Sequence, residues 1–83
     1  MNFTFPNISD EEIKEFYDNV SKKVKKCRKD KNITQLDLSL EIGIKSVAFY
    51  SNCENRKYNK HFNLEHLYKI SKALNKDISE FIT

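Results

Sequence analysis

The chain has 83 residues, of which 39% are hydrophobic and 33% charged, and its net charge is +3. This length suits one domain, and this balance is typical of a compact fold rather than a disordered chain. One glycine and one proline argue against a β-sandwich or barrel, which needs many turn residues. No apolar run approaches the roughly 20 residues of a membrane span, and no signal segment is present, so we expect a cytoplasmic protein without membrane contact.

Charge is distributed unevenly along the chain. Residues 1–21 contain five acidic residues and one basic residue, whereas residues 22–83 contain 14 basic and seven acidic residues. The first region therefore carries a charge of −4 and the second a charge of +7. Only the second region has the positive field expected of a protein that binds a polyanion.

The first predicted element is a long helix that follows an extended arm over residues 1–8. Ser9 is its predicted N-cap, with Glu12 completing a capping box, and Asn32 is suited to the left-handed conformation that closes a helix. Apolar residues recur at spacings of three and four on one stripe. They are Ile13, Phe16, Tyr17, Val20, Val24 and Cys27. We interpret the lysines of residues 22–31 as a solvated helix face rather than as a patch that binds nucleic acid.

Two short helices come next. Thr34 caps a predicted helix over residues 35–42, which Gly43 closes, and Ser46 caps a second over residues 47–55. Their inward residues are Leu38, Ile42, Tyr50 and Cys53. Residues 55–62 are polar and aperiodic, which predicts a loop.

The last two predicted helices complete an all-α fold. Asn63 caps the fourth, Asn75 ends it, and Asp77 caps a final short turn. The core face of the fourth helix is predicted to carry Leu64, Leu67, Ile70, Ala73 and Leu74. The final turn carries Ile78, Phe81 and Ile82. Nothing in the chain reads as a strand.

Two short helices around a glycine-containing turn outline a helix-turn-helix. Specific signals are Thr34-Gln35 at the opening, Gly43-Ile44 in the turn, Glu54-Asn55 at the end, and the run 64–74. On these residues, the stretch 20–82 resembles the Cro/C1-type (phage-repressor-like, XRE) helix-turn-helix DNA-binding family. The resemblance implies a compact five-helix, lambda-repressor-like domain over residues 9–83, with the helix-turn-helix at 34–55 and an N-terminally extended first helix.

The resemblance also implies which residues contact DNA. The helix over 47–55 would enter the major groove, where Asn52 can bond an adenine edge and Val47 and Ala48 can contact thymine methyls. The predicted base-reading residues are Val47, Ala48, Ser51 and Asn52. The predicted phosphate contacts are Gln35, Lys45, Ser46, Arg56, Lys57 and Lys60.

The chain departs from the family pattern between Gly43 and Glu54, where it has one residue more than usual. With Ser46 as the cap, the extra residue lies in the turn. If it lay in the helix, each base contact would rotate by about 100°. The loop after Glu54 is also longer, and its aromatic residues Tyr58 and Phe62 either fill the edge of the core or track a DNA backbone.

Leu36 and Leu40 are unusually apolar for the family's second helix. Cover by Phe3, Phe5 or Ile8 of the arm and a subunit contact are both open explanations. Residues proposed for a dimer or partner contact are Ile13, Phe16, Leu36, Leu40, Ile78, Phe81 and Ile82.

The chemistry-bearing residues favour binding over catalysis. Cys27 and Cys53 read as buried reduced thiols, and no metal-ligand spacing, activated nucleophile or nucleotide-binding loop is present. We therefore expect no metal, no cofactor and no enzymatic activity. The leading hypothesis is a sequence-specific transcriptional regulator, a repressor or an activator, that binds double-stranded DNA as a homodimer on a pseudo-palindrome. The alternatives are the DNA-binding antitoxin of a toxin pair and a protein-interaction module that has lost DNA binding.

Overall fold

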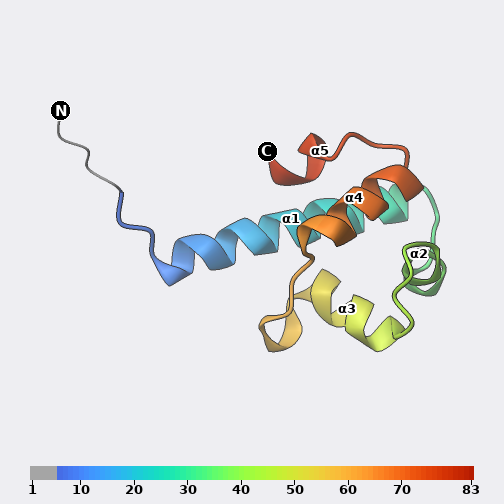
Figure 1. Ribbon diagram of the computed structural model, residues 1–83, viewed down its shortest axis with the longest axis horizontal. Helices are drawn as coiled ribbons and strands as arrows, with labels where there is room; N and C mark the ends of the chain where they lie inside the picture. The colour runs from blue at the N-terminus through green and yellow to red at the C-terminus, as the bar shows by residue number, and fades with distance from the viewer. Residues whose placement is uncertain (1–5) are drawn as a thin grey trace.

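A computed structural model describes residues 6–83 of the chain, and these residues form helices and loops but no strand. The elements are α1 (Asp10–Asp30), α2 (Gln35–Glu41), α3 (Val47–Asn55), a short 3-10 turn η1 (Lys57–Asn59), α4 (Leu64–Ala73) and α5 (Ser79–Ile82). Figure 1 shows α5 and α3 on opposite sides of the long helix α1. The predicted all-α architecture of five helices is confirmed, and η1 lies within the predicted loop.

The predicted caps start the helices where expected. Side-chain oxygens accept hydrogen bonds from backbone amides at four N-termini. The pairs are Ser9 with Glu12 at 3.1 Å, Thr34 with Asp37 at 3.0 Å, Ser46 with Phe49 at 3.1 Å and Asn63 with His66 at 2.7 Å. Within the described residues, the reciprocal bond of a capping box forms at Asn63 and His66 and not at Ser9 and Glu12.

Left-handed residues end α1, α2 and α4 ahead of short connections, and Arg56 does so at the end of α3, with φ of 57°. Asn32 and Asn75 adopt φ of 57° and 54°, as predicted, and Gly43 adopts φ of 81° between α2 and α3. Asp77 caps the last turn with its carboxylate, which accepts from the amide of Ser79 at 2.9 Å. The short connections follow from these residues, because each closes one helix within two or three residues of the next cap.

The core lies where α1, α3, α4 and α5 meet. Its fully buried apolar residues come from every helix and from the loop before α4. They are Val20, Val24, Leu38, Ile42, Tyr50, Cys53, Phe62, Leu67, Ile70, Leu74 and Phe81. The inward positions predicted for α2 and α3 are therefore confirmed. Burying each of the larger side chains contributes about 1.5–3 kcal/mol.

Three predicted positions differ in the structure. Leu64 is 74% exposed, because Phe62 enters the core just ahead of α4 and already fills that end. Tyr58 is 81% exposed, so of the two loop aromatics only Phe62 fills the core edge. Phe81 is 2% exposed and packs in the core, which removes it as a subunit contact, whereas Ile82 remains 39% exposed.

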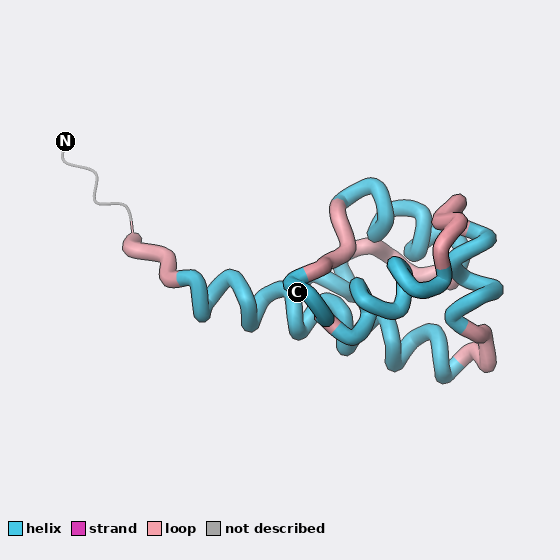
Figure 2. The backbone as a smooth tube through the Cα atoms, turned by 90° about the horizontal axis from the view of Figure 1, so that it is seen from below, coloured by secondary structure: helices cyan, strands magenta, loops and turns pink. Residues whose placement is uncertain are grey.

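The first half of α1 extends beyond the rest of the molecule (Figures 1 and 2). The described residues that precede α1 lie at this end, and α2 lies at the other end of the molecule (Figure 1). Ile8, in that segment, is 60% exposed and therefore does not cover Leu36 or Leu40, which are also exposed. The expectations for Phe3 and Phe5 concern residues outside the described range. None of the helices in residues 6–83 is long and apolar enough to cross a membrane.

Candidate nucleic-acid interface

The turn between α2 and α3 holds the extra residue. The helix begins at Val47 with Ser46 as its cap, so residues 42–46 form the turn and α3 runs without an insertion to Asn55. Tyr50 and Cys53 consequently point into the core and are fully buried. The predicted placement of the extra residue in the turn, with Tyr50 and Cys53 on the inward side of α3, is confirmed.

The opposite side of α3 is exposed and carries small or polar side chains, which we call the α3 face. Val47 is 40% exposed, Ala48 is exposed, and Ser51 and Asn52 are half-buried. Asn55 belongs to the same face, because its Nδ2 donates to the Ser51 hydroxyl at 3.2 Å. These five side chains lie within about 140° of one another at 100° per residue.

Phe49 lies between the buried side of α3 and the α3 face. The side chain is half-buried and packs against the core. Its ring meets that of His66 edge to face, with centroids 6.0 Å apart. Phe49 is therefore part of the hydrophobic packing and not of the α3 face.

The C-terminal end of α3 is anchored by the buried carboxylate of Glu54. Arg28 of α1 donates to it twice, from Nε at 2.9 Å and from Nη2 at 2.8 Å. The Tyr50 hydroxyl donates at 2.7 Å, and the Gln35 amide donates at 3.2 Å. One carboxylate thus joins α1, α2 and α3 and fixes the α3 face relative to the rest of the domain.

The charge states of this cluster follow from burial and pairing. Burial alone would raise the pKa of Glu54, but the hydrogen bonds from Arg28, Tyr50 and Gln35 outweigh it and lower that pKa. The bond with Glu54 raises the pKa of Arg28. Burial, reinforced by Glu54, raises the pKa of Tyr50, so its hydroxyl remains a donor. Arg28 and Glu54 are therefore both ionised at neutral pH.

Gln35 sits in the first turn of α2, beside the buried cluster. Its bond to Glu54 holds the side chain half-buried at the start of the helix. Backbone amides at a helix N-terminus attract anions, and Thr34 already satisfies one of them through Asp37. Gln35 is thus held in a fixed position at the end of α2 where a phosphate contact was predicted.

The loop between α3 and α4 presents basic residues beside α3. Lys57, Lys60 and Tyr58 are exposed, and Lys45 is exposed in the turn before α3. In Figure 1 this loop and α3 lie along the same lower edge of the molecule. Lys45, Lys57 and Lys60 therefore flank α3, as the sequence predicted.

Arg56 differs from these lysines because its guanidinium is engaged within the protein. Its Nε donates to Asp18 at 2.9 Å, its Nη1 donates to the Lys60 carbonyl, and it lies over the Tyr17 ring. Tyr17 also stacks on His61, with ring centroids 3.9 Å apart. Hydrogen bonds from Lys14 and Arg56 lower the pKa of Asp18, which keeps this pairing charged. Arg56 thus fastens the loop to α1.

A comparison with known protein families matches residues 24–81, more than half of the chain, to the family described as Helix-turn-helix. The chain belongs to the Cro/C1-type helix-turn-helix family. The family match covers α2, the turn and α3 and extends into α5, so the helix-turn-helix is a DNA-binding domain. The first half of α1 lies outside the matched residues. No curated protein and no solved structure matches the chain significantly.

Three residues of this helix-turn-helix site were missed by sequence reasoning. Arg28 lies within the lysine-rich stretch 22–31 and looks like one more solvated cation, whereas it is buried against Glu54, 26 residues away. Asn55 was read only as the helix end, although its spacing of four from Ser51 places it on the α3 face. Lys25 donates to Asn55 at 3.4 Å, and its approach from α1 has no sequence signal.

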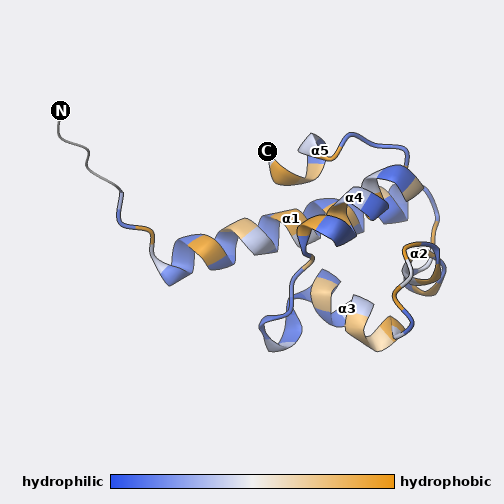
Figure 3. Cartoon of the chain, in the orientation of Figure 1, coloured by the Kyte–Doolittle hydropathy of each residue, from blue (hydrophilic) through white to orange (hydrophobic). Residues whose placement is uncertain are grey.

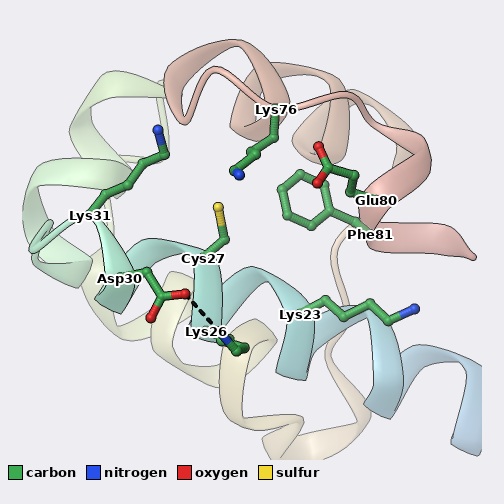
Figure 4. A pocket seen from close by; sticks show the side chains of 8 residues that line it. All are labelled: Lys23, Lys26, Cys27, Asp30, Lys31, Lys76, Glu80 and Phe81. Carbon is green, nitrogen blue, oxygen red and sulfur yellow. Dashed lines mark hydrogen bonds and ion pairs between the residues drawn. The ribbon is translucent and has the colours of Figure 1, made fainter.

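The lysines of α1 divide between two sides of the helix-turn-helix domain. Lys25 reaches α3, whereas Lys23, Lys26 and Lys31 line a pocket of about 320 Å³ between α1 and α5 (Figure 4). Lys26 pairs there with Asp30 at 2.7 Å. Lys22 and Lys25 instead line a hollow with Asn55 and Arg56 at the end of α3, so the lysine run is shared between the two sides.

The two cysteines of the domain differ in burial. Cys53 is fully buried in α3, and burial raises the pKa of its thiol. Cys27 is only half-buried, and Figure 4 shows its sulfur facing the pocket between α1 and α5. Both cysteines are free thiols. The expectation that they are buried is confirmed for Cys53, whereas Cys27 is only partly buried.

Proposed function

We propose that the protein is a sequence-specific transcriptional regulator that inserts α3 into the major groove of double-stranded DNA. The observation that carries this proposal is the α3 face, which is accessible and carries only small or polar side chains. Its direction is fixed by the bonds of Arg28, Tyr50 and Gln35 to Glu54. A rigid helix with accessible amide and hydroxyl groups is suited to reading base edges.

Individual base-reading roles follow from the chemistry of the α3 face. Asn52 bonds the N6 and N7 atoms of an adenine, because its amide offers one donor and one acceptor. Val47 and Ala48 contact thymine methyls, and Ser51 adds a hydroxyl that suits either base type. Asn55 joins this set through its bond to Ser51, with Lys25 behind it.

Affinity comes from contacts with the phosphate backbone on both sides of α3. Lys45, Lys57 and Lys60 neutralise phosphates, and Gln35 binds one at the start of α2. The Ser46 oxygen accepts from Phe49, which leaves its hydroxyl hydrogen for a phosphate. Arg56 supports these contacts by holding the loop, because two of its nitrogens are already bonded within the chain.

Two copies of the chain bind one pseudo-palindromic site. One small module contacts only a few base pairs, and a twofold-symmetric dimer doubles the number that are read. The bound dimer then acts as a repressor or an activator of nearby transcription.

Selection from a pool of random duplex DNA tests this function. At about 150 mM salt, which suppresses non-specific binding, the chain should enrich a pseudo-palindrome with adenine at corresponding positions of the two half-sites. Enrichment of no sequence, with the protein shown to be folded, would contradict specific regulation.

A further inference from the structure

The first half of α1 is an unusual feature of this domain because it has little of its own fold to pack against. Burial on α1 begins at Val20 and continues toward its C-terminal end. The preceding turns project from the globule, as two perpendicular views show (Figures 1 and 2). This segment also lies outside the family match, which begins at residue 24. We call residues 10–19 the projecting half of α1.

One side of the projecting half is covered, and the neighbouring side is apolar and open. The loop after α3 covers Tyr17 and Asp18 through His61 and Arg56. Ile13 and Phe16 remain 45% and 48% exposed. Isolated helices shorter than about 12–15 residues are marginal in water, so exposed apolar groups on such a segment call for a packing partner.

The end of α5 carries a further exposed apolar residue. α5 packs along the middle of α1, and its C-terminal end is directed toward the projecting half (Figure 3). Ile82, near that end, is 39% exposed. Ile13 and Phe16 therefore form the open apolar surface, and Ile82 is exposed at the end of α5 that is directed toward it.

The charges along α1 indicate what covers this surface. The first turns carry Asp10, Glu11 and Glu12, whereas the next half begins with Lys22 and Lys23. Two copies of α1 side by side in parallel would place acid against acid and lysine against lysine. An antiparallel pair places the acidic turns of each copy against the lysines of the other.

We propose that two copies of the chain associate through antiparallel packing of the projecting halves of α1, about a twofold axis near Phe16. Such an interface is isologous, so the two Phe16 side chains meet near its centre and Ile13 of each copy lies to either side of them. At a rotation of 100° per residue, Glu12 and Lys23 lie on the same flank of α1, and with the twofold axis between residues 17 and 18 they face each other across it. The proposal deepens the homodimer of the proposed function, and it is tested without DNA, so either can fail alone.

The first test measures the mass of the full chain in solution by light scattering or sedimentation. The wild type should have twice the chain mass, and Phe16→Glu should have the mass of one chain. Leu40→Glu is the matched control, because Leu40 is a similarly exposed apolar residue on α2 and lies outside the interface. Helical circular dichroism and the unfolding midpoint show that each variant is folded. A monomeric wild type at near-millimolar concentration, or a Phe16→Glu dimer, would overturn the proposal.

The second test exchanges the charges. Glu12→Lys places a lysine against Lys23 of the second copy, and Lys23→Glu places a glutamate against its Glu12. Each folded single variant should dimerise more weakly alone than the wild type, because like charges then meet twice, and an equimolar mixture of the two should form a heterodimer with both pairs restored. Failure of the mixture to associate, or dimerisation of either variant alone at wild-type strength, would contradict the antiparallel arrangement. Dimers that Leu40→Glu abolishes would place the interface on α2 instead.

Discussion

At the scale of single residues, Glu54 determines how the domain is held together. Its carboxylate is buried at 4% exposure and accepts hydrogen bonds from Arg28, Tyr50 and Gln35, which belong to three different helices. A buried carboxylate is stable only while its partners compensate for the lost hydration. The orientation of the α3 face therefore depends on residues that do not lie on it.

Removing one partner should reveal this dependence. We expect Arg28→Ala to lower the free energy of unfolding by about 3–5 kcal/mol, because it leaves an uncompensated buried charge. Lys29→Ala, the neighbouring exposed cation, should change it by less than about 0.5 kcal/mol. Urea unfolding followed by circular dichroism measures both values. Equal small losses in the two variants would show that the buried pair does not anchor α3.

The pH dependence of stability tests the same carboxylate. Because the pKa of Glu54 in the fold lies below its ordinary value of 4.5, its ionised form stabilises the fold above that value. This contribution is lost as the pH falls through the lowered pKa. We expect the free energy of unfolding to fall from about pH 5 downward, and to fall less steeply in Glu54→Gln. The lowered pKa values of Asp18 and Asp77 act in the same direction and remain in the variant. An unchanged slope in Glu54→Gln would contradict the assignment.

At the scale of elements, the sequence predicted the helices because their limits are local. Side-chain caps and left-handed residues act within three or four positions, so Ser46 and Asn32 could be recognised without knowing the fold. Contacts between elements could not be recognised in this way. Arg28 meets Glu54 only after α1 and α3 have packed, and Leu64 is exposed because Phe62, which precedes α4, fills the core.

For the α3 face, too, the local features could be predicted from the sequence and the contacts between elements could not. The cap at Ser46 fixed the start of α3, and the start fixed which side chains point outward. The position of Lys25 near Asn55 and the engagement of Arg56 with Asp18 depend on how α1 crosses the domain. The periodicity of α1 predicted an apolar stripe but could not show that Ile13 and Phe16 extend past the globule.

The cap that sets α3 in place gives a prediction for the element. Ser46→Ala removes the acceptor for the Phe49 amide and should lower the free energy of unfolding by about 1 kcal/mol. Ser46→Asn preserves an acceptor and should stay within a few tenths of a kcal/mol of the wild type. Thermal or urea unfolding distinguishes the two. An alanine variant as stable as the asparagine variant would mean that another residue starts α3.

At the scale of the whole molecule, different surfaces serve different contacts. The α3 face and the loop lysines lie on one side of α1, whereas α5 and the pocket beside Cys27 lie on the other. The projecting half of α1 extends from the end of the domain, and its Asp18 meets the loop after α3 through Arg56. The α3 face itself carries no acidic side chain, so DNA can approach it while Ile13 and Phe16 meet a second copy.

The central claim is that the α3 face reads bases while the loop lysines contribute only general affinity. The most direct test compares Asn52→Ala with Lys57→Ala on the selected DNA site and on single-base variants of it, over a range of salt concentrations. Asn52→Ala should cost about 1–3 kcal/mol and relax preference at one base position. Lys57→Ala should weaken all sequences alike and reduce the salt slope by about one. Identical behaviour of the two variants would contradict the assignment of the α3 face.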